Sequence, residues 1–272
     1  MRATLTGLVM LIGLGATVYL LICLLLYWRQ ENAIFVPVQN DPFLRSQYEA
    51  NRIELPSDDA ILEGWSLENP QAQHDAVILY FGGNAEDVLY TASLATAFEV
   101  RRAVFFNYRG YGHSTGAPSQ RTLYADAARI YDYLIRDGVR TDQLIVIGRS
   151  LGSGMATMLA GSRPVAGVVL ITPFDSLAAV ATEHYPGIPI RLLLRHPFAS
   201  LDWAANAKAP ALFLVAERDR IIPPSHARHL FDSWPARKEF HLLPGRGHND
   251  IDQDSTYYPL INAFIASTIH TD

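Results

Sequence analysis

The strongest chemical signal in the sequence is a serine between two glycines, in the stretch LIVIGRSLGSG. Gly148, Ser150 and Gly152 form a G-x-S-x-G pattern that follows an apolar run and precedes a segment of small residues. A serine at a tight turn between a strand and a helix is held in a strained backbone conformation, and glycines let the two elements approach closely. We therefore predict that Ser150 is a nucleophile. The alternative is a Gly-Ser turn without chemistry.

The candidate for the base that activates this serine is His248, in the stretch LLPGRGHND. It lies in a loop just beyond the last predicted strand, and the flanking Gly245 and Gly247 let the backbone turn the imidazole toward the sheet. Histidine is the side chain best suited to exchange a proton near neutral pH. We expect solvated or structural roles for the eight other histidines.

The third predicted member of the site is Asp219, whose carboxylate would fix the tautomer of His248 and stabilise the imidazolium during attack. Asp219 lies in LFLVAERDRIIPP, just past an apolar run and before two prolines. Glu217 and Asp175 are the alternatives for this role.

Attack on a carbonyl also needs hydrogen-bond donors for the oxyanion, and the stretch YFGGNAED is the candidate source. Gly82 and Gly83 follow an apolar run, so we predict that the backbone N–H of Asn84 points into the same space as that of Leu151. The alternative is an ordinary glycine turn. The predicted chemistry implies no cofactor and no metal.

Six short apolar runs are the predicted strands that position these residues: AVILYF, AVFFNY, LIVIG, VVLIT, ALFLVA and EFHLL. Their continuous hydrophobicity is typical of strands buried on both faces. Segments of helical period alternate with them, the clearest at 122–138, with one apolar face made of Leu123, Ala127, Ile130, Tyr131 and Leu134. This alternation predicts an α/β fold with a mostly parallel sheet and helices on both faces. The preceding runs RIEL and ILEGWSL predict an antiparallel edge.

The chain begins with an uncharged apolar stretch, Leu5 to Trp28, which we predict to be a transmembrane anchor (5–28). A helix of this length rises roughly 36 Å, enough to cross a bilayer with some tilt. A cleaved secretory signal is the alternative, but the stretch ends in bulky residues rather than a small-x-small site. We expect a single-pass membrane protein, whose flanking Arg2 and Arg29 give no bias that would set its orientation.

The remaining chain is predicted to contain a connecting segment (29–51) and one catalytic domain (52–272). A net charge of -5 without long runs of one sign gives no reason to expect nucleic acid as a partner. The single cysteine, Cys23, lies in the apolar stretch, so no intramolecular disulfide can form.

The stretch 174–202 interrupts the alternation of strands and helices, and we predict that it forms a small cap above Ser150. Its many apolar residues are interspersed with Arg191 and Arg195. These apolar residues either pack on the core or admit the acyl chain of a substrate.

Six stretches, FGGNAED, NYRGYGHSTGAPS, IGRSLGSG, ITPFDSL, ERDRIIPP and GRGHND, resemble the alpha/beta-hydrolase superfamily over roughly 52–268. More narrowly, they resemble its serine-aminopeptidase-like and protein-depalmitoylase-like groups, several members of which have an N-terminal membrane anchor. The chain order Ser150, Asp219, His248 is also that of alpha/beta hydrolases. The resemblance implies that these residues are nucleophile, acid and base, with Asn84 and Leu151 as oxyanion donors. One departure is Gly82, where relatives often have histidine.

Together these features predict a serine hydrolase that cleaves an ester or thioester of a small-molecule or acyl substrate through an acyl-enzyme. One alternative is a serine peptidase of the aminopeptidase type, although no acidic cluster is visible that would select a free amino terminus. Another is a non-catalytic binding protein on the same fold, since fold alone does not establish function.

Overall fold

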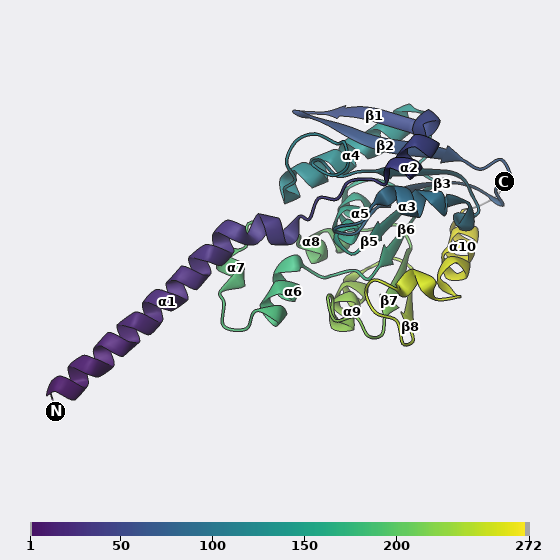
Figure 1. Cartoon of the computed structure of the whole chain (residues 1–272). Helices are drawn as coiled ribbons and strands as arrows, with labels where there is room; N and C mark the ends of the chain where they lie inside the picture. The colour runs from purple at the N-terminus through teal and green to yellow at the C-terminus, as the bar shows by residue number, and fades with distance from the viewer. Residues whose placement is uncertain (1, 270–272) are drawn as a thin grey trace.

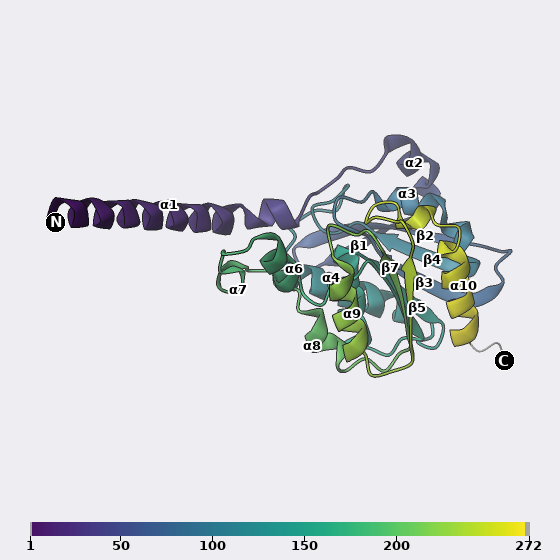
Figure 2. The ribbon, with the colours of Figure 1, turned by 90° about the horizontal axis from the view of Figure 1, so that it is seen from below.

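The computed structural model describes residues 2–269 and consists of one domain with a long helix projecting from it (Figures 1 and 2). This helix, α1 (Arg2–Ile34), continues beyond the predicted anchor (5–28) into the predicted connecting segment. The last residues of the predicted catalytic domain, 270–272 with His270, lie outside the described residues.

The centre of the domain is an eight-stranded sheet in the order β1-β2-β4-β3-β5-β6-β7-β8. Its strands are β1 (Arg52–Ser57), β2 (Ala60–Glu68), β3 (His74–Phe81), β4 (Val100–Phe106), β5 (Leu144–Arg149), β6 (Gly167–Ile171), β7 (Ala211–Ala216) and β8 (Lys238–Leu243). The pairs β1–β2 and β2–β4 are antiparallel, and the other pairs are parallel. The predicted parallel sheet with an antiparallel edge is confirmed.

Helices cover both faces of the sheet, as predicted (Figure 1). One face packs on α4 (Gln120–Arg136), α5 (Leu151–Ser162), α8 (Ser200–Ala204) and α9 (Pro224–Ser233), and the other on α3 (Val88–Ser93) and α10 (Tyr257–Thr268). Alternate side chains of β3 enter the two cores: Val77 and Leu79 lie in one, Ile78 and Tyr80 in the other. The buried central strands are apolar on both faces because both faces are covered.

The amphipathic helix predicted at 122–138 is α4, whose buried residues include all five of the predicted apolar face. It begins earlier than predicted because Ser119 and Thr122 form a reciprocal cap, in which the Ser119 side chain accepts from the Thr122 N–H. A side-chain cap satisfies a backbone donor that has no partner inside the helix.

Short helices complete the chain, and two of them lie in the predicted cap. They are α2 (Pro42–Gln47), η1 (Glu49–Asn51), η2 (Ala95–Phe98), η3 (Ile251–Gln253), α6 (Leu177–His184) and α7 (Ile190–Leu193). The ends of the stretch 174–202 pack on the core, where Phe174 and Phe198 are buried. Its middle, residues 182–187, is exposed and lies near α1 (Figure 2).

Candidate active site

Ser150 lies at the turn between β5 and α5 and has a strained backbone. Its φ of 51° and ψ of −116° are rare for residues other than glycine. Such a conformation costs about 1–3 kcal/mol and persists only where the surroundings impose it. Here the Ser150 N–H donates to the Ile171 carbonyl at 2.9 Å, and the Ser153 hydroxyl donates to the Ser150 carbonyl at 2.6 Å. Strand β6 and the first turn of α5 therefore impose the conformation.

The two glycines of the G-x-S-x-G pattern are required by close approach of backbones. A Cβ on Gly148 would lie 2.4 Å from the Gly152 carbonyl oxygen, and a Cβ on Gly152 would lie 2.1 Å from the carbonyl oxygen of Phe81. Both distances are too short for any side chain. The glycines thus let α5 begin directly against β3 and β5, with the serine side chain between them.

Ser150, His248 and Asp219 form one hydrogen-bonded chain. The distance from Nε2 of His248 to Oγ of Ser150 is 2.9 Å, and the distance from Nδ1 of His248 to Oδ2 of Asp219 is 2.6 Å. Because a carboxylate only accepts hydrogen bonds, Nδ1 carries the proton and Nε2 is the acceptor for the serine hydroxyl. The arrangement therefore offers the serine a base that is already in the correct tautomer.

Asp219 is buried, and both of its oxygens have donors. Its Oδ1 accepts from the N–H groups of Ile221 and Ile222 at 2.9 Å and 2.8 Å, which leaves Oδ2 for His248. The loops that carry Asp219 and His248 are joined by a hydrogen bond of 2.8 Å from the Arg218 N–H to the Arg246 carbonyl. Backbone contacts therefore set the orientation of the carboxylate.

The two alternative carboxylates have other partners. Glu217 accepts from the Gly245 N–H at 2.7 Å, at the base of the His248 loop. Asp175 accepts from the imidazoles of His226 and His229, at 2.8 Å and 3.3 Å. Burial raises the pKa of Asp175, but its hydrogen bonds, above all the one with His226, outweigh burial and hold the pKa below the ordinary value. Asp219 is the carboxylate that bonds His248.

The predicted oxyanion loop lies beside the serine. A Cβ on Gly83 would be 3.6 Å from Cβ of Ser150, in ordinary contact. The next residue, Asn84, has its side-chain oxygen fixed by the Val36 N–H at 2.9 Å and the Tyr111 hydroxyl at 2.8 Å. Leu151 is the first residue of α5, and the first N–H groups of a helix have no acceptor inside it. Both predicted donors thus belong to segments that adjoin Ser150.

Glu86 supports the oxyanion loop, and the sequence analysis assigned it no role. Its Oε2 accepts from the Gly83 N–H at 2.6 Å, while its Oε1 accepts from the hydroxyls of Tyr80 and Thr91 at 2.9 Å and 2.7 Å. A short charge-assisted hydrogen bond of this kind is stronger than one between neutral groups. Glu86 therefore fixes the position of the loop that contains Gly82 and Gly83.

Arg149 connects the predicted oxyanion loop with the loop that carries His248. The sequence analysis assigned Arg149 no role either. Its guanidinium lies 3.8 Å from Glu86 and donates to the Asn249 carbonyl, next to His248, at 3.4 Å. Both residues stand inside the motif stretches FGGNAED and IGRSLGSG. That position was the only signal in the sequence, because the bonds of Glu86 depend on how its own loop folds and the contacts of Arg149 join loops far apart in the chain.

Comparison with known proteins identifies the superfamily. A family model described as the alpha/beta hydrolase fold matches residues 76–189. An uncharacterized protein of Mycobacterium tuberculosis is 35% identical over 192 residues, which cover 70% of this chain and 68% of that protein. The chain belongs to the alpha/beta-hydrolase superfamily. The resemblance of the six motif stretches to this superfamily is thereby confirmed.

Two further matches add a link to membranes and a similarity of fold. An uncharacterized membrane protein of Saccharomyces cerevisiae is 30% identical over 221 residues, covering 78% of this chain and 77% of that protein. The structure of an esterase of Pyrococcus furiosus matches with a TM-score of 0.67 and 15% identity, covering 87% of this chain and 100% of that chain. At this low identity the second match shows the shared fold.

This alpha/beta hydrolase carries one helix, among its described residues, that is long and apolar enough to cross a membrane. An 18-residue window within the segment Leu5–Ile34 of α1 has a mean hydropathy of 2.6, and most of the large apolar side chains of the segment are exposed. Residues 2–269 contain no group of three or more His, Cys, Asp or Glu side chains arranged to hold a metal ion.

Proposed function

We propose that this chain is a membrane-anchored serine hydrolase that cleaves a carboxylic ester or thioester through an acyl-enzyme. The observation that carries the proposal is the hydrogen-bonded chain from Ser150 Oγ through His248 to the buried carboxylate of Asp219. A serine with a tautomer-fixed histidine and an orienting carboxylate is the arrangement of an activated nucleophile.

In the first half-reaction, Oγ of Ser150 attacks the carbonyl carbon while Nε2 of His248 takes the hydroxyl proton. The imidazolium that forms is stabilised by Asp219 through Nδ1, and the tetrahedral anion accepts hydrogen bonds from the N–H groups of Asn84 and Leu151. Collapse of this intermediate breaks the bond to the leaving group, which receives the proton from Nε2. The serine is then acylated.

In the second half-reaction, His248 takes a proton from water, and the hydroxide oxygen attacks the acyl carbon. Collapse of the second tetrahedral intermediate returns the proton to Oγ of Ser150 and releases a carboxylic acid. Hydrogen bonds already hold the backbone of Ser150 and the turn that carries Asp219, so little reorganisation is needed at either step. In both half-reactions Nε2 of His248 carries the proton between the reacting groups.

The preference for an ester or thioester is supported by the apolar cap and by the esterase of Pyrococcus furiosus, which shares the fold. The proposed single-pass anchor is α1, supported by its length and hydropathy and by the yeast relative that is called a membrane protein. Extraction of membranes at alkaline pH tests the anchor: the full chain should stay in the pellet, and a cleaved, soluble form would contradict it.

Labelling with a fluorophosphonate probe tests the proposed chemistry directly. The full chain in detergent should be labelled at Ser150, and a panel of p-nitrophenyl esters, acyl thioesters and aminoacyl anilides should show turnover of the first two classes. Labelling elsewhere, or none, would contradict the nucleophile assignment. Preferred cleavage of the anilides would show a peptidase instead.

A further inference from the structure

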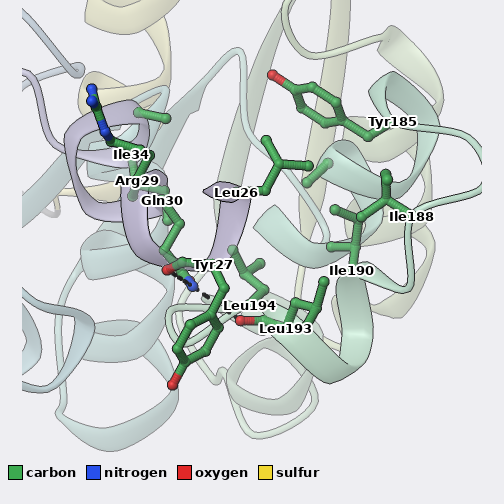
Figure 3. A pocket seen from close by; sticks show the side chains of 12 residues that line it. Leu26, Tyr27, Arg29, Gln30, Ile34, Tyr185, Ile188, Ile190, Leu193 and Leu194 are labelled. Atoms are coloured by element: carbon green, nitrogen blue, oxygen red, sulfur yellow. Dashed lines mark hydrogen bonds between the residues drawn. The ribbon is translucent and has the colours of Figure 1, made fainter. Parts of the chain in front are cut away.

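An apolar pocket lies between the end of α1 and the cap (Figure 3). None of the residues that line it belongs to the candidate triad. Its volume is about 130 Å³, and its walls include Leu26 and Ile34 of α1 and Ala181, Ile188 and Leu193 of the cap. Arg29 and Gln30 also line it, but most of its surface is apolar, and apolar sites of about this size accept compact hydrophobic groups. The pocket is therefore wide enough for part of one acyl chain and too small for a peptide helix.

The cap runs along α1 toward the proposed membrane interior. Gln30 forms two hydrogen bonds with the cap. Its Nε2 donates to the Leu193 carbonyl at 3.0 Å (Figure 3), and its Oε1 accepts from the Arg195 N–H at 2.7 Å. Further along α1, the Tyr19 hydroxyl donates to the Gly187 carbonyl at 2.7 Å. Residues 19 to 30 of a helix rise about 16 Å. Gly187, which we call the cap tip, therefore lies much nearer the N-terminal end of α1 than the part of the cap that bonds Gln30.

The depth of the cap tip follows from the position of α1 in a bilayer. Trp28 is suited to the membrane interface, and Tyr19 lies about 14 Å deeper along the helix axis. The hydrocarbon core is about 30 Å thick, so residues beside Tyr19 lie within one leaflet. Gly187, which contacts Tyr19, is such a residue.

Large apolar side chains are exposed on the surface of the cap. Leu192 is 85% exposed and Tyr185 is 50% exposed. Arg195 pairs with Glu31 at 3.2 Å and lies over the Tyr27 ring, so its charge stays at the level of the predicted interface. Glu183 and Arg191 are also exposed, so charged side chains lie among the apolar ones of the cap.

A short stretch of backbone, residues 34–36, joins the pocket wall to the predicted oxyanion loop. Ile34, in the pocket wall, is followed by Phe35, whose ring packs at 6.3 Å on that of Phe198 at the end of the cap. The next residue, Val36, donates its N–H to the side chain of Asn84. One residue, Phe35, therefore separates Ile34 of the pocket wall from Val36, which bonds the loop beside Ser150.

We propose that the pocket between α1 and the cap binds the acyl chain of a bilayer lipid and that the cap tip is immersed in the same leaflet. This deepens the proposed function, on whose membrane anchor it rests, by naming a membrane-resident acyl compound as the substrate class. The apolar lining, the depth of the cap tip and the link to Asn84 favour this occupant over a water-soluble one.

Photocrosslinking from the bilayer tests the proposal without any turnover. The full chain with Ser150→Ala is reconstituted in phosphatidylcholine vesicles that contain a phosphatidylcholine with a diazirine near the end of one acyl chain. After irradiation, mass spectrometry should find lipid on peptides from 181–194 as well as on α1. Lipid found on α1 but not on 181–194 would overturn the proposal.

A pair of matched variants separates the pocket from general contact with lipid. Ala181→Trp fills the pocket from α6, whereas Ala266→Trp adds the same side chain on the exposed surface of α10. Crosslinking to 181–194 should fall about tenfold in the first, the loss expected for two methylenes that are no longer buried, and stay unchanged in the second. Unchanged crosslinking in Ala181→Trp would overturn the pocket.

A second pocket variant, Ile188→Asn, covers the case in which Ala181→Trp does not fold, and the same loss is expected. Failure of the hydrolase proposal has a different signature. A chain that binds lipid at 181–194 but does not react with fluorophosphonate refutes the proposed chemistry and leaves the pocket standing. A chain that reacts but shows no crosslink at 181–194 keeps the chemistry and loses the pocket.

Discussion

The Asp219 carboxylate lies 2.6 Å from Nδ1 of His248, and its other oxygen is bonded to two backbone N–H groups. The carboxylate therefore cannot rotate away from the imidazole without losing backbone hydrogen bonds in a buried site. The tautomer of His248 is set by the fold of the 219–222 turn before any substrate binds.

Ser150→Ala is expected to abolish fluorophosphonate labelling and to lower kcat by about 10³-fold or more, leaving what the oxyanion donors and binding contribute. The fold should persist, because the methyl group of alanine fits where the serine Cβ already lies. Turnover and thermal unfolding of the purified variant measure the two effects. Normal labelling in Ser150→Ala would refute the assignment of the nucleophile.

Asp219→Asn is expected to lower turnover by about 10³- to 10⁴-fold, because an amide donates to Nδ1 and favours the wrong histidine tautomer. Asp175→Asn is the matched control, since it changes a buried carboxylate that bonds His226 and His229 instead. Its turnover should stay close to that of the unaltered chain. If Asp175→Asn lost more activity than Asp219→Asn, the acid would have to be reassigned.

Glu86→Gln is expected to lower kcat by roughly tenfold to 10²-fold with little change in KM. The amide group cannot accept from all three donors that surround Glu86, so the Gly83 N–H loses its fixed partner and the oxyanion loop loosens. The effect should be smaller than deletion of an oxyanion donor, which costs about 10²–10³-fold. Glu54→Gln, at an exposed position on β1, is the control and should leave both constants unchanged.

The pair formed by His226 and Asp175 is expected to make stability depend on pH. The hydrogen bond to Asp175 raises the pKa of His226 above its ordinary 6.5, and Glu183 at 3.1 Å adds to the effect. Protonation of His226 therefore stabilises the fold fully below pH 6.5, and this contribution is lost as the pH rises through the raised pKa. The lowered pKa of Asp175 sets the acid limit, since its contribution is present above 3.8 and lost as the pH falls through the folded value.

His226→Asn tests this dependence. Breaking a buried charged pair costs about 3 kcal/mol, so the variant should be destabilised by that amount between pH 4.5 and 6. The loss should shrink to about 1 kcal/mol at high pH, where only a neutral hydrogen bond is removed. Denaturant unfolding across this range measures both values. A loss that stays constant with pH would show that His226 is not charged in the pair.

Much of the fold and site follows from the sequence because the information is local. The period of the 122–138 segment identified five of the six residues that α4 buries, all except Asp126, since a helix repeats every 3.6 residues. Likewise, Ser150, Asp219 and His248 were predicted to lie together because each follows an apolar run, and the structure brings their side chains into one hydrogen-bonded chain. The carboxyl ends of neighbouring parallel strands meet at one edge of the sheet, so residues far apart in the chain come together there.

Only the tertiary structure decided which groups touch. Glu217, Asp175 and Asp219 all follow predicted strands, and the bonding of Asp219 to His248 depends on how two loops pack. The contact of Tyr19 with Gly187 joins residues 168 positions apart, and the supporting role of Glu86 depends on the fold of the loop around it. Such contacts are set by the packing of whole elements against one another, for which the local pattern of residue types carries no record.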